Sequence, residues 1–181
     1  MVELFNRYFP ELGEEKIEKL QSLRGLYEEW NSKINVISRK DMEHFDERHV
    51  LHSLAISLFW KPSAGQKAID IGTGGGFPGI PLAIFYPEVN FHLIDSTAKK
   101  IKVVNEVVAA LELKNVKAEQ IRAEEVKGKY DVALSRAVAR LEILVRYCTN
   151  SKMKVKHLIC LKGGDLREEQ EEIDRYPSVI Y

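Results

Sequence analysis

Residues Lys67–Ile84, KAIDIGTGGGFPGIPLAI, have the pattern of a short buried strand, a glycine-rich turn and the start of a helix. Glycine adopts positive φ readily and lets a ligand approach the backbone closely, and the turn contains Gly72, Gly74, Gly75 and Gly76. Prolines follow where the first turn of a helix tolerates a missing N–H. The free amides and the dipole at a helix start favour a negatively charged ligand group. The stretch therefore predicts the first half of a nucleotide-binding βαβ unit.

An acidic residue at the end of this strand narrows the class of nucleotide. Gly74 to Gly79 has the formal spacing G-x-G-x-x-G, which by itself is a weak signal for a dinucleotide. Asp70 stands two positions before the first glycine, where its carboxylate would oppose a pyrophosphate but would suit an ammonium or sulfonium group. S-adenosylmethionine carries both groups, so we expect this methyl donor as cofactor. The alternative is a plain strand-to-helix turn without a ligand.

Length and composition are typical of one soluble globular domain with a small appendage. The chain has 181 residues, of which 45% are hydrophobic and 30% charged. Its 27 basic and 27 acidic residues cancel, so any nucleic acid would have to bind a local basic patch. Cys148 and Cys160 fit no C-x-x-C spacing, which favours buried thiols. Since no signal peptide opens the chain and its apolar runs are too short to span a bilayer, we expect a cytoplasmic protein.

Hydrophobic periodicity divides the chain into a helical extension, residues 1–60, and a larger domain, residues 61–181. Glu14–Trp30 has apolar residues at three- and four-residue steps, which predicts an amphipathic helix. A second helix is expected at about Met42–Phe59. We expect that helix to bury Phe45, Leu51, Leu54, Leu58 and Phe59. The extension is interpreted as packing on the sheet of the larger domain.

From residue 67 onward strand and helix patterns alternate, which predicts an α/β, Rossmann-like fold with a mostly parallel twisted sheet and helices on both faces. The expected strands are Lys67–Ile71, Asn90–Asp95, Val116–Ile121, Tyr130–Ser135 and Lys156–Lys162. The expected helices are Gly79–Phe85, Lys99–Leu111, a single turn at Glu124–Val126, Ala139–Ser151 and Asp165–Tyr176. A further strand is expected to begin at Val179–Tyr181.

Ligands of an open parallel sheet bind outside the carboxyl ends of its strands, so the residues at those ends are the predicted site. The first strand contributes Asp70, Gly72, Gly74, Gly76 and Phe77. The second strand ends at Asp95, about twenty residues past the glycines, where an acid hydrogen-bonds the ribose hydroxyls of a nucleotide. A helix N-cap is the alternative role for Asp95.

The next strand ends supply further candidates. Arg122, Ala123 and Glu124 follow the third strand, where they would flank an adenine ring or form a solvated charge pair. Arg136 follows the apolar DVAL run, and an arginine there is hard to place in a core, so we interpret it as facing the site. The fifth strand leads into a second glycine turn, Lys162-Gly163-Gly164, beside the predicted pocket.

Two clusters of basic residues are compatible with a nucleic-acid partner. The first cluster is Arg39, Lys40, Arg48, His49 and His52, and the second is Arg136, Arg140, Arg146, Lys152, Lys154 and Lys156. If both clusters face the same rim, they form a phosphate-binding surface around the pocket. The alternative is that the charges are dispersed over the surface. His49 and His52 match no H-E-x-x-H pattern and lie near no cysteine pair, so we expect no metal.

Motifs spread over nearly the whole chain carry a more specific resemblance. They are Trp30-Asn31 with Asn35, Arg48-His49 with Ser53-Leu54, the DIGTGGGFPGIPLA run, Asp95-Ser96 with Lys99-Lys100, Ala123-Glu124, Tyr130-Asp131 leading into SRAVA, and Lys162-Gly163. The combination of GFPGIPLA with SRAVA is the most specific part. With these motifs the chain resembles the bacterial 16S ribosomal RNA guanine-N7 methyltransferases, the RsmG or glucose-inhibited division protein B (GidB) family.

The resemblance implies a seven-strand methyltransferase sheet, S-adenosylmethionine as donor, and a guanine in the 530 loop of 16S ribosomal RNA as acceptor. The partner would be that RNA or the small ribosomal subunit, and we expect the enzyme to act as a monomer. Carried over by position, the residues that contact the donor would be Gly72, Phe77, Ala123, Glu124 and Arg136. We expect Arg136 to steer donor or target rather than to act as a base.

Two departures from the family pattern stand out. His52 occupies a position where the family usually has an aspartate, which puts the role of that carboxylate in doubt. The chain also stops where a closing pair of strands is expected, so we expect the final strands to be missing.

Three other functions stay open on the residues alone. An NAD-linked oxidoreductase would need an acid or base at the nicotinamide, and the sequence offers no convincing one. A non-catalytic RNA- or ribosome-binding module with a vestigial nucleotide pocket is a second alternative. The third is a methyltransferase of another substrate class, because the pocket features by themselves do not specify RNA.

Overall fold

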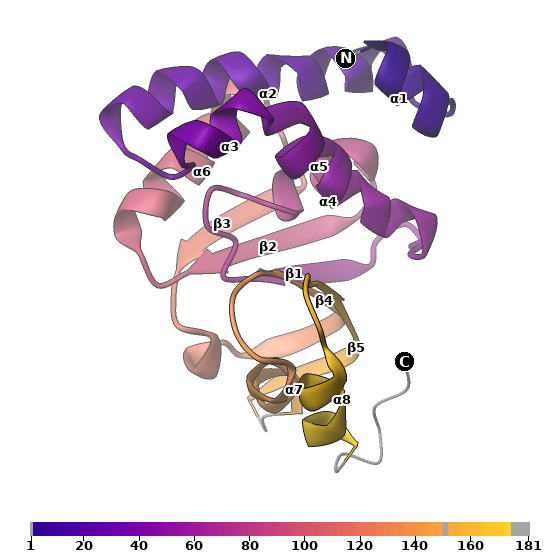
Figure 1. The fold of residues 1–181 in the computed structure, drawn as a ribbon, viewed down its shortest axis with the longest axis vertical. Helices are drawn as coiled ribbons and strands as arrows, with labels where there is room; N and C mark the ends of the chain where they lie inside the picture. The colour runs from indigo at the N-terminus through magenta and orange to yellow at the C-terminus, as the bar shows by residue number, and fades with distance from the viewer. Residues whose placement is uncertain (1, 150–151, 175–181) are drawn as a thin grey trace.

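The computed structural model of the chain, which describes residues 2–149 and 152–174, is organised around a five-stranded parallel sheet (Figure 1). Its strands are β1 (Lys67–Ile71), β2 (Asn90–Asp95), β3 (Val116–Gln120), β4 (Gly128–Arg136) and β5 (Met153–Leu161). They lie in the order β3-β2-β1-β4-β5, and every neighbouring pair is parallel. The predicted α/β fold is confirmed. Because the strand order reverses at β1, the loops after β1 and β4 diverge and leave a crevice between them.

The central strand β1 is the most buried strand of the sheet. Ala68, Ile69, Asp70 and Ile71 are all buried, and β1 pairs with β2 on one side and with β4 on the other. A strand covered on both faces is mostly apolar, and Ala68, Ile69 and Ile71 of β1 indicated its bounds correctly, although Asp70 interrupts the apolar run. The bounds of β2 were also correct, whereas β4 and β5 begin two and three residues earlier than expected.

Helices cover both faces of the sheet. On one face lie α5 (Gly79–Phe85) and α6 (Ala98–Ala110), with α2 (Glu14–Lys33) across them (Figure 1). On the other face α7 (Leu141–Thr149) and α8 (Arg167–Ile173) pack against each other. The third connection is only a single 3₁₀ turn, η3 (Ala123–Glu125). The expected strand at Val179–Tyr181 lies outside the described residues.

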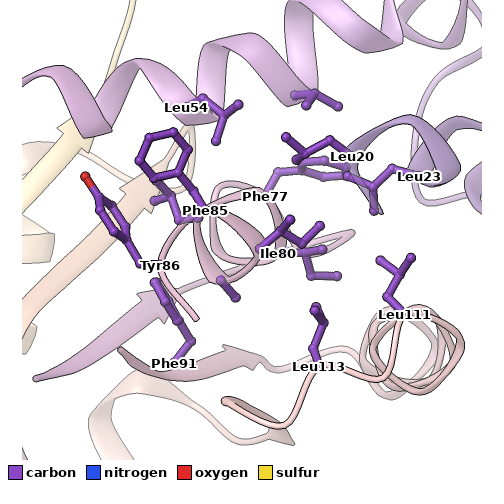
Figure 2. Close-up of a cluster of buried hydrophobic side chains, with 14 of the residues drawn as sticks. Leu20, Leu23, Leu54, Phe77, Ile80, Phe85, Tyr86, Phe91, Leu111 and Leu113 are labelled. Carbon is purple, nitrogen blue, oxygen red and sulfur yellow. The ribbon is translucent and has the colours of Figure 1, made fainter. Parts of the chain in front are cut away.

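The N-terminal extension shares one hydrophobic core with the helices of the sheet. It begins with a helix that the sequence did not predict, α1 (Val2–Tyr8), and continues into α2. Figure 2 shows Leu20 and Leu23 of α2 packed beside Phe77 and Ile80. The same cluster reaches Phe91 of β2, so the extension and the sheet bury a continuous apolar volume. No helix of the described residues is long and apolar enough to cross a membrane.

The expected second helix is broken into four short segments. These are α3 (Arg39–Glu43), the π-helical turn η1 (Asp46–Leu51), α4 (His52–Leu54) and the 3₁₀ turn η2 (Ala55–Leu58). Phe45 and Leu54 are buried as predicted, and Leu51 is partly buried. The prediction was wrong for Leu58 and Phe59, which are 59% and 87% exposed. The turns η1 and η2 depart from 3.6 residues per turn, so the buried face rotates and Ser57 becomes buried instead.

Candidate functional site

A cavity of about 500 Å³ opens at the carboxyl ends of β1, β2, β3 and β4. A volume of this size is typical of small-molecule sites in proteins. Of the nine predicted site residues, seven line it: Gly72, Gly74, Phe77, Asp95, Ala123, Glu124 and Arg136. The sheet therefore brings together side chains from four separate strand ends. Asp70 and Gly76 do not line the cavity.

Gly72 and Gly76 give the turn after β1 its shape. Their φ angles are +68° and +96°, in the region that favours glycine. A Cβ at Gly72 would lie 2.7 Å from a methyl group of Val138, and a Cβ at Gly76 would lie 2.5 Å from Ile80 Cδ1. Gly76 therefore serves the packing beneath the turn, while Gly72 forms part of the cavity wall.

Asp70 is fully buried behind the turn and holds its two ends together. Its Oδ2 atom accepts hydrogen bonds from Thr73 Oγ1 at 2.7 Å and from the Gly79 backbone N–H at 2.9 Å. Within the described part of the chain, Oδ1 has no hydrogen-bond partner. Burial raises the pKa of Asp70 to about 6. This carboxylate therefore does not line the cavity itself. It fixes the shape of the glycine turn and places a titratable group behind it.

Asp95 links the glycine turn to the start of α6. Its Oδ1 accepts from the Thr97 N–H at 2.8 Å, and its Oδ2 accepts from the Gly74 N–H at 3.1 Å. Lys100 Nζ lies 3.6 Å from Oδ2. The N-cap of α6 is Thr97, so Asp95 is not itself the cap residue. A carboxylate oxygen has more than one acceptor site, so each oxygen can also accept from a ligand hydroxyl in the cavity.

Residues after β3 form a further part of the cavity wall. Ile121, Arg122, Ala123 and Glu124 all line the cavity. Glu124 Oε1 accepts a hydrogen bond from Tyr147 Oη at 3.3 Å. Among the described residues no ion pair joins Arg122 to Glu124, so the alternative of a solvated charge pair is not what the structure shows.

Arg136 ends β4 and bridges the cavity to the N-terminal extension. Its Nη1 donates to the Arg48 carbonyl oxygen at 2.9 Å, and its Nη2 lies 2.8 Å from His49 Nδ1. The guanidinium carbon lies 5.3 Å from the centre of the Phe77 ring. Burial lowers the pKa of Arg136, and the nearby carboxylate of Asp70 acts in the opposite direction. Its two Nη bonds leave the guanidinium with further N–H groups for a ligand.

The extension supplies cavity residues that sequence reasoning missed. These are Val36 and Ile37, in the loop after α2; His49 of η1, which was expected only as part of a basic cluster, also lines the cavity. The loop is held by Asn31, whose Oδ1 accepts from the N–H groups of Val36 at 2.8 Å and Ile37 at 3.0 Å. Asn31 Nδ2 also donates to the Ile37 carbonyl oxygen at 2.7 Å. The motif Trp30-Asn31 with Asn35 was the signal in the sequence, and it was used only as evidence of a family resemblance.

Tyr27 of α2 is a second contact between the extension and the site. Its side chain is fully buried, and its hydroxyl donates to the carbonyl oxygen of Gly75 in the glycine turn. Burial raises the pKa of Tyr27, so its hydroxyl stays protonated and remains a donor at neutral pH. In the sequence Tyr27 is one of the apolar residues that recur at three- and four-residue steps in Glu14–Trp30, and that pattern indicates only a core position.

Of the second basic cluster, Arg136 lines the cavity, whereas Arg140, Arg146, Lys152, Lys154 and Lys156 do not, so the structure favours the alternative of dispersed charges. Lys152, Lys154 and Lys156 lie at the start of β5, where Met153 is paired with Gly128 at the amino end of the sheet. The cavity lies at the opposite, carboxyl end. The Arg140 guanidinium lies 2.6 Å from a carboxylate oxygen of Glu172.

The first basic cluster does lie near the cavity. Arg39 and Lys40 are exposed on α3, directly after the wall residues Val36 and Ile37. Arg48 is 2.9 Å from an oxygen of Asp41.

In the second glycine turn, Lys162 donates to the Ala139 carbonyl oxygen and pairs with Glu169, and it does not line the cavity. Across residues 2–149 and 152–174, no group of three or more His, Cys, Asp and Glu side chains is arranged to hold a metal ion.

Comparison with known proteins identifies relatives over most of the chain. The GidB family, described as rRNA small subunit methyltransferase G, matches residues 16–180. A protein of Flavobacterium psychrophilum named Ribosomal RNA small subunit methyltransferase G is 52% identical over 175 residues, which are 93% of this chain and 84% of that protein. A protein of the same name from Phocaeicola vulgatus is 46% identical over 186 residues, covering 99% of this chain and 88% of its own.

Two solved structures share this fold over most of the chain. Coclaurine N-methyltransferase bound to N-methylheliamine and SAH matches with a TM-score of 0.58 at 16% identity, over 81% of this chain and 50% of that chain. The StiE O-MT segment 961–1257 matches with a TM-score of 0.55 at 17% identity, over 75% of this chain and 50% of that chain. At such low identity these similarities concern the fold alone, and they agree with the predicted Rossmann-like α/β fold.

Proposed function

This chain belongs to the GidB family of rRNA small subunit methyltransferases G, and from that premise we propose that it methylates N7 of a guanine in 16S ribosomal RNA. The methyl donor is S-adenosylmethionine. The observation that carries the proposal is the cavity at the carboxyl ends of the strands, where Gly72, Asp95 and Arg136 meet. A site at this edge of a parallel sheet is where the fold binds its ligands.

The residues of the cavity fit the donor. The glycine turn offers exposed backbone, Asp95 has acceptor capacity for ribose hydroxyls, and Ala123 with Glu124 lies where an adenine would be flanked. Behind the turn, Oδ1 of Asp70 has no partner in the described structure, and a cation above the turn would stabilise that carboxylate. The bound donor supplies an electrophilic methyl group on a sulfonium centre.

Methylation of guanine N7 requires few catalytic groups from the protein. Guanine N7 has an in-plane lone pair and no proton to lose, so the site needs no general base. The residues of the cavity have to hold N7 in line with the methyl group, and such positioning contributes several kcal/mol to barrier reduction. Asp95 and Glu124 place negative charge on the wall, which favours the cationic methylated guanine.

Neither cysteine fits the alternative of a thiol nucleophile. Cys148 and Cys160 do not line the cavity. Burial raises the pKa of Cys148 to about 12 and that of Cys160 to about 11. Since the thiolate is the nucleophilic form, both thiols are unreactive at neutral pH. This argues against carbon-5 methylation of cytosine through a covalent intermediate.

We assign the RNA phosphate contacts to the rim beside α3. Arg39 and Lys40 are exposed next to the wall formed by Val36 and Ile37, and Lys100 and Arg122 line the cavity itself. Arg39→Ala and Lys40→Ala should therefore raise KM for RNA severalfold and leave donor affinity unchanged. Lys154→Ala removes an exposed lysine at the opposite edge of the sheet and serves as the matched control, with KM for RNA unchanged.

The deciding experiment is methyl transfer from radiolabelled S-adenosylmethionine to naked 16S RNA and to small ribosomal subunits, followed by mapping of the modified nucleotide. We expect N7-methylguanine at one position. Absence of methyl transfer to either substrate would favour the alternative of a non-catalytic RNA-binding module. Radioactive label in protein or in a small molecule would indicate a methyltransferase of another substrate class. Calorimetry with S-adenosylhomocysteine and with NADH separates the methyltransferase from the oxidoreductase.

A further inference from the structure

His49 makes an unusual hydrogen bond with Arg136. Nη2 of Arg136 lies 2.8 Å from His49 Nδ1. A guanidinium carries five N–H donors and no acceptor, so His49 Nδ1 has to present a lone pair. The imidazole is therefore neutral, with its proton on Nε2. Within the described part of the chain, Nε2 is buried and has no hydrogen-bond partner.

The surroundings of His49 keep the ring in place and uncharged. The imidazole lies between two aromatic rings, 5.7 Å from the centre of Phe45 and 5.0 Å from the centre of Phe77. Burial is the main cause that lowers the pKa of His49, to about 4. The positive charges that face it, Arg136, Arg48 and His52, act in the same direction, and Asp41 opposes them.

The segment that carries His49 offers Arg136 a second acceptor. Nη1 of Arg136 donates to the Arg48 carbonyl oxygen, so both Nη bonds end on consecutive residues of η1. The segment η1 is a π-helical turn, a feature that often occurs at functional sites. Arg136 is thus held across the cavity wall by the extension, and its remaining N–H groups are left for a ligand carboxylate.

We propose that His49 is a positioning residue, the hydrogen-bond acceptor that holds Arg136 in the orientation that receives the carboxylate of the methyl donor. This inference rests on the proposed function, because it assigns a partner to the same site. The donor has one carboxylate, on its methionine part, and a guanidinium pairs with such a group in a fixed, planar geometry. A guanidinium held at two points gives up less conformational freedom when that pair forms.

Two substitutions distinguish the contribution of the hydrogen-bond acceptor at His49 from the contribution of its aromatic ring. His49→Phe keeps an aromatic ring between Phe45 and Phe77 but removes the acceptor. His49→Asn keeps an acceptor oxygen close to the position of Nδ1. His44→Gln is the matched control, because His44 is an exposed histidine at the end of α3. Thermal unfolding of each variant checks that the fold is kept.

The readout is the affinity for S-adenosylhomocysteine, which retains the carboxylate, measured by calorimetry without RNA. We expect His49→Phe to weaken binding roughly tenfold, the loss typical of one hydrogen bond to a charged group, and His49→Asn and His44→Gln to stay within about threefold. A folded His49→Phe variant with wild-type affinity, or His49→Asn as weak as His49→Phe, would overturn the role of His49. If the wild-type chain bound no S-adenosylhomocysteine, the proposed function itself would fail.

A second readout reports on the ring directly. Nitrogen-15 NMR of the imidazole should show a bare Nδ1 and a protonated Nε2 in the wild-type protein. In Arg136→Leu the pKa of His49 should rise, because a positive charge that faces it is removed. A proton on Nδ1 at neutral pH would contradict the hydrogen bond on which the inference stands, whatever the binding data show.

Discussion

The two walls of the cavity are held together in different ways. On the sheet side, the side chains that shape the glycine turn bond to residues 3 to 21 positions away: Asp70 to Thr73 and Gly79, and Asp95 to Gly74. On the side of the extension, the bonds span 48 to 88 positions: Tyr27 to Gly75, and Arg136 to Arg48 and His49. The sheet wall is therefore a local motif, whereas the other wall exists only when the extension docks.

The difference suggests how each wall can be disturbed. Changes beneath the glycine turn should reach the common core and lower the stability of the whole chain. Changes in the extension should act mainly on the loop after α2 and on the orientation of the turn.

The largest effect is expected for Gly79→Ala, beneath the sheet wall. A Cβ at this position would lie 2.7 Å from Leu93 Cγ and 2.8 Å from Asp70 Oδ2, both of them buried. Overpacking of this kind lowers the free energy of unfolding by about 3 kcal/mol. The control is Gly25→Ala, in the middle of α2, where an added Cβ has no neighbour within 4 Å. This substitution should raise the free energy of unfolding by about 0.5–1 kcal/mol. Urea unfolding measures both, and equal stabilities would refute the packing argument.

The next effect is the pH dependence that Asp70 gives to stability. Burial raises the pKa of Asp70 from 3.8 to about 6, so between these values the folded chain binds a proton more tightly than the unfolded chain. The resulting stabilisation is fully present below the unfolded pKa and is lost as pH rises through about 6. It amounts to about 3 kcal/mol at most.

Asp70→Asn lacks this titration and isolates the contribution. As pH rises from about 4 to about 7, the unfolding free energy of the wild-type chain should fall relative to that of Asp70→Asn. Denaturant unfolding at several pH values in this range measures it. A difference that stays constant with pH would mean that the buried carboxylate titrates normally.

On the side of the extension, Asn31→Ala should have a smaller effect on stability. It removes the three hydrogen bonds that hold Val36 and Ile37, and the backbone groups they leave are partly buried. We expect a loss of about 2 kcal/mol and faster hydrogen exchange at the amides of Val36 and Ile37. The control Asn35→Ala, at an exposed asparagine of the same loop, should change neither. Unchanged exchange in Asn31→Ala would mean that the loop is held by other contacts.

The smallest effect is expected for Tyr27→Phe. It removes only the hydroxyl that donates to the Gly75 carbonyl oxygen, while the ring stays packed against Phe45 and Phe77. The free energy of unfolding should fall by about 1 kcal/mol, and affinity for S-adenosylhomocysteine should fall severalfold. Tyr8→Phe, at a tyrosine that is 53% exposed, is the control. Wild-type affinity in Tyr27→Phe would show that the turn keeps its shape without the extension.

Local chemistry was enough to predict most of the sheet and one wall of the site. The run from Lys67 to Ile84 specifies a strand, a turn and a helix within itself, because apolar strand residues and glycines with positive φ act over a few positions. Alternating strand and helix patterns then imply a parallel sheet, and its carboxyl ends meet at one edge. That rule, together with the spacing of Asp95 from the glycines and the poor fit of an arginine to a core, predicted Asp95 and Arg136 as site residues, and both line the cavity.

Packing between distant segments decided the rest. Whether Asp70 faces a ligand or lies behind the turn depends on which side of the turn Thr73 and Gly79 offer their donors, and no periodicity encodes that direction. The exposure of Phe59 and the place of Lys154 at the far edge of the sheet likewise follow from how helices end and where β5 begins. Contacts such as Arg136 to His49 join residues 87 positions apart, so only the folded chain could reveal them.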